Sequence, residues 1–197
     1  MERRATVSRQ TAETTITVSL MLDGQGLFEG TSGIGFLDHM LRAFATHGLF
    51  DLNLAVRGDL EVDAHHTVED LGLCLGRAFR QALGEAKGIS RYGYVLLPMD
   101  EALVLVAADV SGRPFLAYDV DLTPSNLGGL ETDLVPEFLR ALAQEAGLTL
   151  HVRKLAGRNG HHTVEAIFKG LGRALRQAVS LDPRLEGPPS TKGTLGW

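Results

Sequence analysis

The chain has 197 residues, of which 44% are hydrophobic and 22% are charged, with a net charge of −5 at pH 7. This composition predicts a globular protein with a sizeable core, and the negative charge disfavours nucleic acid or an anionic membrane as partner. The most apolar run, residues 101–110, is too short to span a bilayer, and the first 20 residues lack the apolar region of a signal peptide. We therefore expect a soluble, cytoplasmic protein.

Hydrophobic periodicity predicts helices and strands that alternate along the chain. β-Rich or alternating segments indicate strands, and apolar residues at positions i, i+3, i+4 and i+7 indicate helices. Gly48 and Gly147 are expected to close two of the helices, and Gly88 to follow a third. In chain order the predicted elements are a strand at 14–22, a helix at 36–48, strands at 50–58 and 101–114, with a helix at 67–86 between them, a helix at 134–147, a strand at 148–153 and a helix within 159–179.

The chain contains an internal duplication. When His65 is aligned with His161, an offset of 96 residues, HHTVE recurs unchanged and LGRAFRQAL lies over LGRALRQAV. Upstream, DHMLRAFA lies over PEFLRALA at an offset of 98. The predicted fold is therefore α/β (α+β), with helices packed on a sheet in each of two related halves. The predicted divisions are a first half at 1–93, a second half at 94–182 and a tail at 183–197, with a loop at 121–133 at the junction.

Each HHxxE motif has the residue types and spacing of a metal site. On a helix, His65 and Glu69 are four residues apart and share a face, and His66 and Glu69 are also within reach. The two adjacent histidines point about 100° apart, so one rigid helix presents them to two different ions. The alternative is that one histidine caps the helix and the glutamate is solvated. The occurrence of two copies favours metal binding.

The duplication indicates further ligands. His39 lies over Glu137 in the upstream alignment, and both residue types bind divalent cations. His151 and His47 align with Ala55 and Glu145, so we do not assign them as ligands. A set of imidazoles and carboxylates without thiolate suits Mn²⁺, Fe²⁺, Co²⁺ or Zn²⁺. The predicted ligands, four for each of two metals, are His39, His65, His66, Glu69, Glu137, His161, His162 and Glu165.

A second group of polar residues indicates an anion site. Arginine binds phosphate through two parallel hydrogen bonds, and a Ser-Thr-Lys run offers hydroxyls and an ammonium group to the same oxygens. Taken singly, each of these residues is more often a solvated surface residue. Cys74, the one cysteine, lies among leucines on a helical pattern and is expected in the core. The candidate phosphate-binding residues are Arg91, Arg113, Ser190, Thr191 and Lys192.

From the residues alone, the chain is predicted to be a duplicated two-metal enzyme for a small anionic substrate. A dinuclear metallohydrolase that acts on a small phosphate ester meets the same description. A metal-binding or storage protein is a third reading, although it leaves the basic residues without a purpose.

Several motifs together resemble the imidazoleglycerol-phosphate dehydratase family. They are FLDHML, GDLEVDAHHTVEDLG, RYG, DVSGRP, LHVRKLAGRNGHHTVEAIFK and STKG, which span nearly the whole chain. The resemblance implies a duplicated unit in which each half is a four-stranded sheet with two helices on one face. It also implies a homo-oligomeric shell of 24 subunits with metal sites between subunits, and two Mn²⁺ ions per active site. The implied reaction removes water from imidazole glycerol phosphate to give imidazole acetol phosphate in histidine biosynthesis.

The resemblance also assigns roles to individual residues. It places Glu13 at the substrate, and Arg91, Arg113, Ser190 and Lys192 at the substrate phosphate. It assigns seven of the eight predicted ligands to metal binding. Glu137 departs from family members that carry histidine there, but the internal alignment also selects it, and we keep it as a ligand. Our hypothesis makes Glu165 the catalytic base and Glu13 an acid or a group that orients the substrate.

Overall fold

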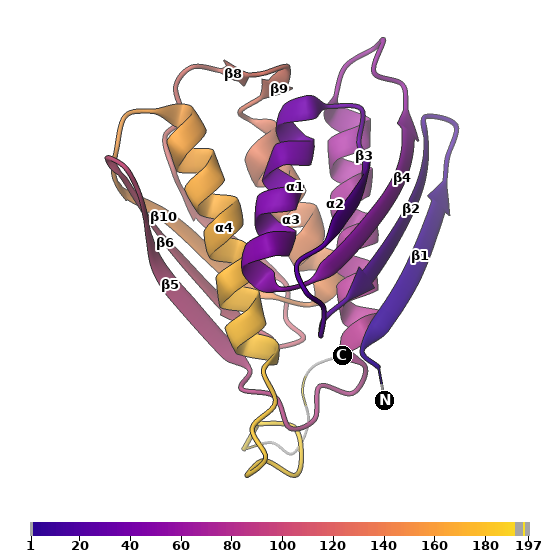
Figure 1. Cartoon of the computed structure of the whole chain (residues 1–197), viewed down its shortest axis with the longest axis vertical. Helices are drawn as coiled ribbons and strands as arrows, with labels where there is room; N and C mark the ends of the chain where they lie inside the picture. The colour runs from indigo at the N-terminus through magenta and orange to yellow at the C-terminus, as the bar shows by residue number, and fades with distance from the viewer. Residues whose placement is uncertain (1, 192–194, 196–197) are drawn as a thin grey trace.

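The structure, a computed structural model, describes residues 2–191 and residue 195. Two four-stranded sheets form its outer layers, and four helices fill the space between them (Figure 1). This arrangement confirms the predicted α+β fold with a duplicated unit. Within the described residues, no helix is both long enough and apolar enough to cross a membrane.

The first half forms one sheet and two helices. Its strand order is β1-β2-β4-β3, in which β1, β2 and β4 are antiparallel neighbours and β3 runs parallel to β4. Helices α1 and α2 contact the inner face of this sheet. The elements are β1 (Arg4–Gln10), β2 (Thr14–Met21), β3 (Phe28–Thr31), α1 (Gly35–Gly48), β4 (Asp51–Gly58) and α2 (His65–Leu83).

The second half repeats this topology. Its strand order is β5-β6-β10-β7, with β7 parallel to β10, and α3 and α4 contact its inner face. The loop expected at the junction of the halves, residues 121–133, instead lies inside the second half and carries a two-stranded hairpin. The elements are β5 (Tyr92–Met99), β6 (Ala102–Asp109), β7 (Phe115–Asp119), β8 (Asn126–Leu127), β9 (Leu130–Glu131), α3 (Leu134–Ala146), β10 (Thr149–Ala156) and α4 (Gly160–Val179).

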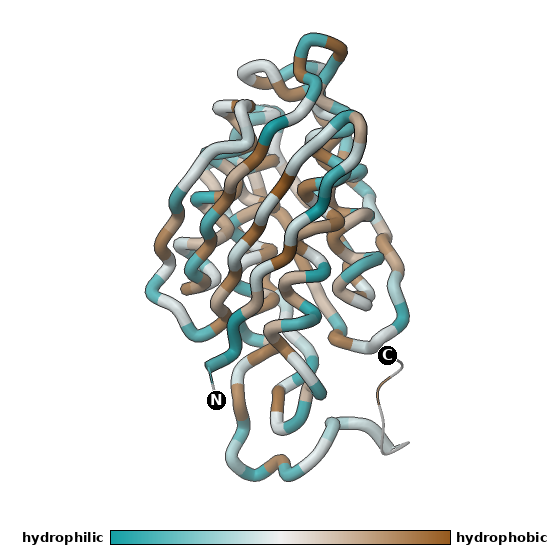
Figure 2. The backbone as a smooth tube through the Cα atoms, turned by 90° about the vertical axis from the view of Figure 1, so that its right-hand side faces the viewer, coloured by the Kyte–Doolittle hydropathy of each residue, from teal (hydrophilic) through white to brown (hydrophobic). Residues whose placement is uncertain are grey.

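Alternating side chains explain how each sheet has a buried and an open face. In β2, Ile16, Val18 and Leu20 point into the core and are fully buried. The residues between them point outward, where Thr17 and Ser19 bond to hydroxyls of β1. Figure 2 views the first sheet face-on and shows hydrophobic and hydrophilic residues alternating along its strands.

Hydrophobic periodicity predicts the central strands of both sheets but none of the four edge strands. The missed strands are β1, β3, β5 and β7, which border the two sheets. Edge strands have weaker patterns because part of each lies in solvent: β1 is polar along most of its length, and β5 contains a glycine and a proline. The total of four strands in each half was expected only from the family resemblance.

The two halves meet helix against helix. Helix α1 packs against α4, and α2 packs against α3. Glycines allow the close approach: a Cβ on Gly172 of α4 would lie 2.4 Å from the Phe44 carbonyl oxygen of α1. A Cβ on Gly72 of α2 would lie 2.7 Å from the Phe138 carbonyl oxygen of α3. The backbones of helices from different halves are therefore in direct contact.

The predicted helix ends are partly corrected. Gly147 follows α3 in the left-handed conformation, as expected. Gly48 does not serve as the left-handed residue after α1, because Leu49 takes that conformation with φ 53°. Helix α2 ends at Leu83 and is followed by Gly84 with φ 62°, so Gly88 does not end it.

Candidate metal centre

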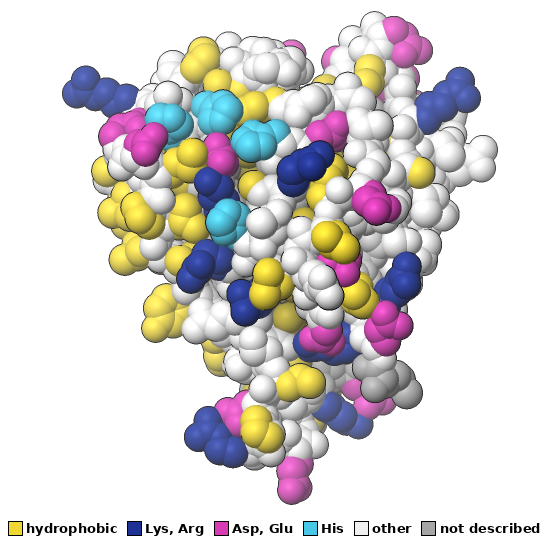
Figure 3. Space-filling model, in the orientation of Figure 1, with side chains coloured by type: hydrophobic (Ala, Val, Ile, Leu, Met, Phe, Trp, Pro, Cys, Tyr) yellow, Lys and Arg dark blue, Asp and Glu magenta, His cyan; other side chains and the backbone are white. Residues whose placement is uncertain are grey.

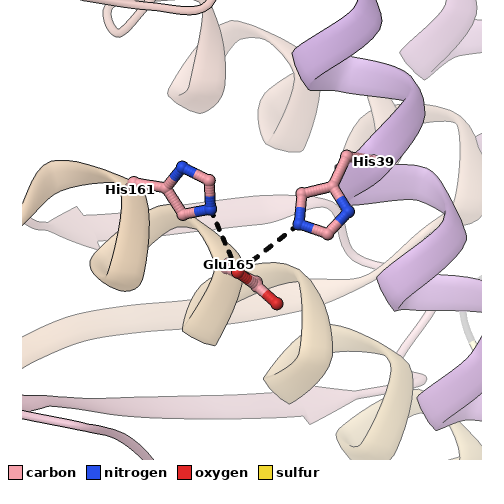
Figure 4. A group of neighbouring side chains, drawn as sticks. All are labelled: His39, His161 and Glu165. Carbon is pink, nitrogen blue, oxygen red and sulfur yellow. Dashed lines mark hydrogen bonds and ion pairs between the residues drawn. The ribbon is translucent and has the colours of Figure 1, made fainter.

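Three predicted ligands lie together at one end of the interface between the halves. Their ligand atoms, from His39, His161 and Glu165, all lie within 4.8 Å of one another. His161 Nε2 is 3.2 Å and His39 Nε2 is 3.5 Å from Glu165 Oε2. Both rings point toward the carboxylate (Figure 4). Two imidazole nitrogens and one carboxylate oxygen suit a divalent transition metal.

The helix packing explains why these three residues meet. His161 and Glu165 are one turn apart on α4, so the helix itself pairs them. His39 is on α1 and reaches them because α1 packs closely on α4. The side chain of Asp38 fixes the start of α1, since it accepts hydrogen bonds from the backbone N–H and the hydroxyl of Ser32, both at 2.6 Å. The cluster therefore combines one residue of the first half with two of the second.

Glu165 is charged although it is buried. The residue is 7% exposed, and burial, the largest single effect, raises its pKa. The hydrogen bond and charge of Lys169, whose Nζ is 2.8 Å from Oε1, together with His39, outweigh burial and lower the pKa below its usual value. Lys169 was not selected from the sequence. Two features of the sequence could have indicated it: Lys169 lies four residues after Glu165, and the first copy has Leu73 at the corresponding place.

The second histidine of each doublet points elsewhere. The two ring centroids of each doublet are 6.2 Å apart, and the second ring bonds to a carboxylate that the first does not contact. His66 Nδ1 lies 3.0 Å from Asp59 Oδ2, and His162 Nδ1 lies 2.8 Å from Glu101 Oε2. These hydrogen bonds raise the pKa of both histidines. A carboxylate on Nδ1 orients the ring and leaves Nε2 for a ligand, an arrangement typical of metal-binding histidines.

Acidic residues at two β-turns approach these same histidines. Glu13, in the turn between β1 and β2, has Oε1 3.7 Å from His66 Nε2. Asp100, in the turn between β5 and β6, has Oδ2 3.6 Å from His162 Nε2. Glu13 was selected through the family resemblance, whereas Asp100 and the two carboxylates bonded to Nδ1 were missed. Asp59 lies only seven residues before His66. Glu101 lies 61 residues from His162, and Asp100 is its neighbour in the chain, so their signal is spatial.

The remaining predicted ligands do not assemble in the same way within one chain. His65 Nε2 is 3.8 Å from Glu69 Oε2 on the same helix, and Glu137 forms an ion pair with Arg140. In the described part of the chain, the group around Glu165 is the one set of three close ligand atoms. The assignment of all eight residues to two metals remains a prediction.

The candidate phosphate-binding residues gather at the opposite end of the second half. Arg91 Nε is 2.7 Å from Asp109 Oδ1, and a guanidinium nitrogen of Arg113 is 3.9 Å from the other oxygen of the same carboxylate. Arg91 also donates to the carbonyl of Pro189, which places the tail beside it. Ser190 and Thr191 follow in that tail, whereas Lys192 lies outside the described residues.

This end of the molecule is far from the histidine cluster. The backbone N–H of Arg91 donates to the carbonyl of Ala178, close to the C-terminus of α4, whereas His161 is at its N-terminus. With a rise of about 1.5 Å per residue, the two positions are about 25 Å apart. On the surface, histidine side chains group at one end with an acidic side chain among them, and basic side chains follow below (Figure 3).

A family model described as imidazoleglycerol-phosphate dehydratase matches residues 32–175, which include both HHxxE motifs and the cluster. The chain belongs to the imidazoleglycerol-phosphate dehydratase family. Through that membership it is an enzyme of the hydro-lyase class. Imidazoleglycerol-phosphate dehydratase from Moorella thermoacetica is 62% identical over 195 residues, which cover 99% of this chain and 100% of the relative.

Solved structures of dehydratases from this family share the fold. The enzyme from Staphylococcus aureus is 36% identical with a TM-score of 0.82, over 91% of this chain and 99% of that one. The enzyme from Pyrococcus furiosus, solved in complex with (S)-C348, is 40% identical with a TM-score of 0.82, over 96% of this chain and 100% of that one. The duplicated sheets and helices are therefore shared with these dehydratases.

Proposed function

We propose that the protein removes water from imidazole glycerol phosphate to give imidazole acetol phosphate, as a Mn²⁺-dependent step of histidine biosynthesis. The observation that carries this proposal is the cluster of His39, His161 and Glu165 in a chain of the dehydratase family. Nitrogen and oxygen donors without thiolate are compatible with Mn²⁺, which accepts both.

The chemistry of the substrate explains the need for such a site. The C–H bond that breaks has no neighbouring keto group and lies one carbon away from the ring, on the carbon next to the one that loses its hydroxyl. Its electron pair forms the new C=C bond as the C–O bond breaks, so the imidazole ring must stabilise the charge that develops at the carbon beside it. A divalent cation, when bound, would supply positive charge at the ring nitrogens as the proton leaves. The residues that would hold cations are the six histidines and glutamates of the two motifs, together with His39 and Glu137.

The carboxylates supply the proton transfers in this proposal. Glu165 is held ionised by Lys169 and His39, so it is ready to accept a proton at neutral pH. Glu13 is more than half exposed and faces His66, which allows it to orient the substrate or to donate a proton to the departing hydroxyl. Arg91, Arg113 and the tail would bind the phosphate.

We further infer that each active site is shared between chains in a homo-oligomer. A small phosphorylated imidazole is far shorter than the roughly 25 Å along α4 between the histidine cluster and Arg91. One chain therefore cannot supply both ends of a site, but two copies can bring opposite ends together. The expected assembly of 24 subunits is one way of arranging such contacts.

Turnover on metal-free protein tests the proposed function. Chelator-treated protein is assayed with imidazole glycerol phosphate for ketone formation, and the same sample is assayed again after addition of Mn²⁺. We expect activity to disappear and to return. Release of inorganic phosphate without ketone would instead indicate a phosphate-ester hydrolase, and no reaction with Mn²⁺ would contradict the proposal.

A further inference from the structure

A buried acidic residue links the Glu13 turn to the helix that carries the first HHxxE motif. Asp70 follows Glu69 on α2, and its side chain is 10% exposed. One carboxylate oxygen accepts a hydrogen bond from Arg9 Nε of β1 at 2.8 Å, and the other accepts from Thr14 Oγ1 of β2 at 2.5 Å. Asp70 thus binds both strands of the hairpin at the end where Glu13 lies.

The turn itself is ordered by a second set of hydrogen bonds. The Thr11 hydroxyl accepts from the backbone N–H groups of Glu13 and Thr14 at 3.1 and 2.9 Å. The backbone N–H of Thr11 donates to the carbonyl of Thr14 at 2.9 Å. Thr14 follows the turn, is 2% exposed and donates the hydrogen bond to Asp70, so it joins the turn directly to α2. The backbone of Glu13 is therefore fixed relative to α2.

The carboxylate of Glu13 takes no part in holding this turn. Among the described residues the carboxylate pairs with His66, whose Nε2 is 3.7 Å from Oε1, and the side chain is 52% exposed. The second half is built differently. There Ala166 occupies the position of Asp70, and the turn is held by Glu101, whose carboxylate accepts from the backbone of Asn159 and contacts His162. In the first half Asp70 makes the structural link, and the Glu13 carboxylate faces His66 instead.

We propose that Asp70 is a positioning residue that, through Arg9 and Thr14, sets the Glu13 carboxylate beside His66 for the dehydration step. This inference rests on the proposed function, in which Glu13 acts on the substrate. Asp70 itself is covered by the hairpin and touches no reacting atom. Its effect on turnover passes through Glu13.

A double-mutant cycle tests this role. D70N keeps the size of the side chain but removes the charge that pairs with Arg9. It should lower kcat about tenfold, with KM changed less than about threefold, and change turnover less than about twofold in the E13Q background. Hydrogen exchange at the amides of Glu13 and Thr14 should be faster in D70N. D23N is the matched control, because Asp23 pairs with Arg3 at the other end of the same hairpin. It should leave turnover and both amides unchanged.

Equal losses from D70N in the wild-type and E13Q backgrounds would overturn the positioning role, as would unchanged turnover in D70N. If E13Q alone turns over at the wild-type rate, the role of Glu13 in the proposed function fails as well, so the two failures are distinguishable. Should D70N not fold, Thr14 provides the same test. T14V removes the hydroxyl that bonds Asp70 and should reproduce the loss, and T14S should retain activity; equal activity in the two would overturn the proposal.

Discussion

Glu165 is the residue on which the proposed chemistry depends most. It contacts His39, His161 and Lys169, and it is the most buried member of the cluster. E165Q keeps the shape of the side chain but cannot accept a proton. We expect turnover to fall by about 10²–10⁴, the usual contribution of a general base, while substrate still binds. Steady-state turnover and calorimetric binding on the Mn²⁺-loaded protein measure the two quantities. Near-normal turnover would remove Glu165 from the role of base.

The sequence prediction that Cys74 belongs to the core is confirmed, because the residue is fully buried. Burial raises the pKa of its thiol to about 11. Between about pH 8.5 and pH 11 the folded protein therefore keeps a thiol proton that the unfolded chain loses. The protonated thiol favours the folded state fully below about pH 8.5, and this stabilisation is lost as the pH rises through about 11. We expect iodoacetamide at pH 8 to leave the native protein unmodified and to alkylate it in guanidinium, as measured by mass spectrometry. Rapid alkylation of the native protein would contradict this environment.

At the scale of elements, the contact between α1 and α4 connects stability with the site. G172A should place its methyl group 2.4 Å from the Phe44 carbonyl oxygen and push α1 away from α4. We expect the free energy of unfolding to fall by about 1–3 kcal/mol, the usual effect of overpacking. Affinity for Mn²⁺ should also fall, because His39 moves away from Glu165. Denaturant unfolding and metal titration measure the two effects.

Gly35 provides the matched control for this substitution. It is the first residue of α1, and a Cβ there would meet no atom within 4 Å. G35A should change the free energy of unfolding by less than about 0.5 kcal/mol and leave metal affinity unchanged. If G172A were as harmless as G35A, the close helix contact would not be what brings His39 to the cluster.

At the scale of the whole molecule, the separation of the two candidate sites predicts complementation between chains. E165Q should inactivate the histidine end and R113A the phosphate end, so each variant alone should be nearly inactive. Coexpressed or refolded together, they should regain up to about a quarter of wild-type activity, because random pairing forms some sites with both intact ends. Activity no higher than that of the separate variants would mean that each site lies within one chain.

The elements differ in how far the sequence predicted them. The central strands β2, β4, β6 and β10 and all four helices were predicted from periodicity, because burial of one face imposes a regular pattern. The edge strands carry a weaker pattern. Helix α1 ends at Gly48 as predicted, although Leu49 takes the left-handed conformation, whereas α2 ends at Leu83 and not near Gly88. The position of Gly48 has no room for a side chain, because a Cβ there would lie 2.4 Å from the ring of Phe50.

The candidate site divides in the same way. HHxxE spacing on a helix fixed the pairing of His161 with Glu165, since residues one turn apart always share a face. Asp59, Glu101 and Lys169 were missed. Asp59 contacts His66 from the loop just before α2, seven residues away, and Glu101 contacts His162 from a turn 61 residues away. Nothing local distinguishes either of them from a solvated acid.

The sequence by itself determined the duplication, the paired motifs, the residue types suited to a divalent cation and the family resemblance, because all of these are properties of residue order. The tertiary structure alone decided that His39 joins the motif of the opposite half. That choice depends on which helices pack together, and α1 reaches α4 through backbone contact at Gly172. It also placed Arg91 at the far end of α4 from His161, because the chain returns there to pair with the end of that helix.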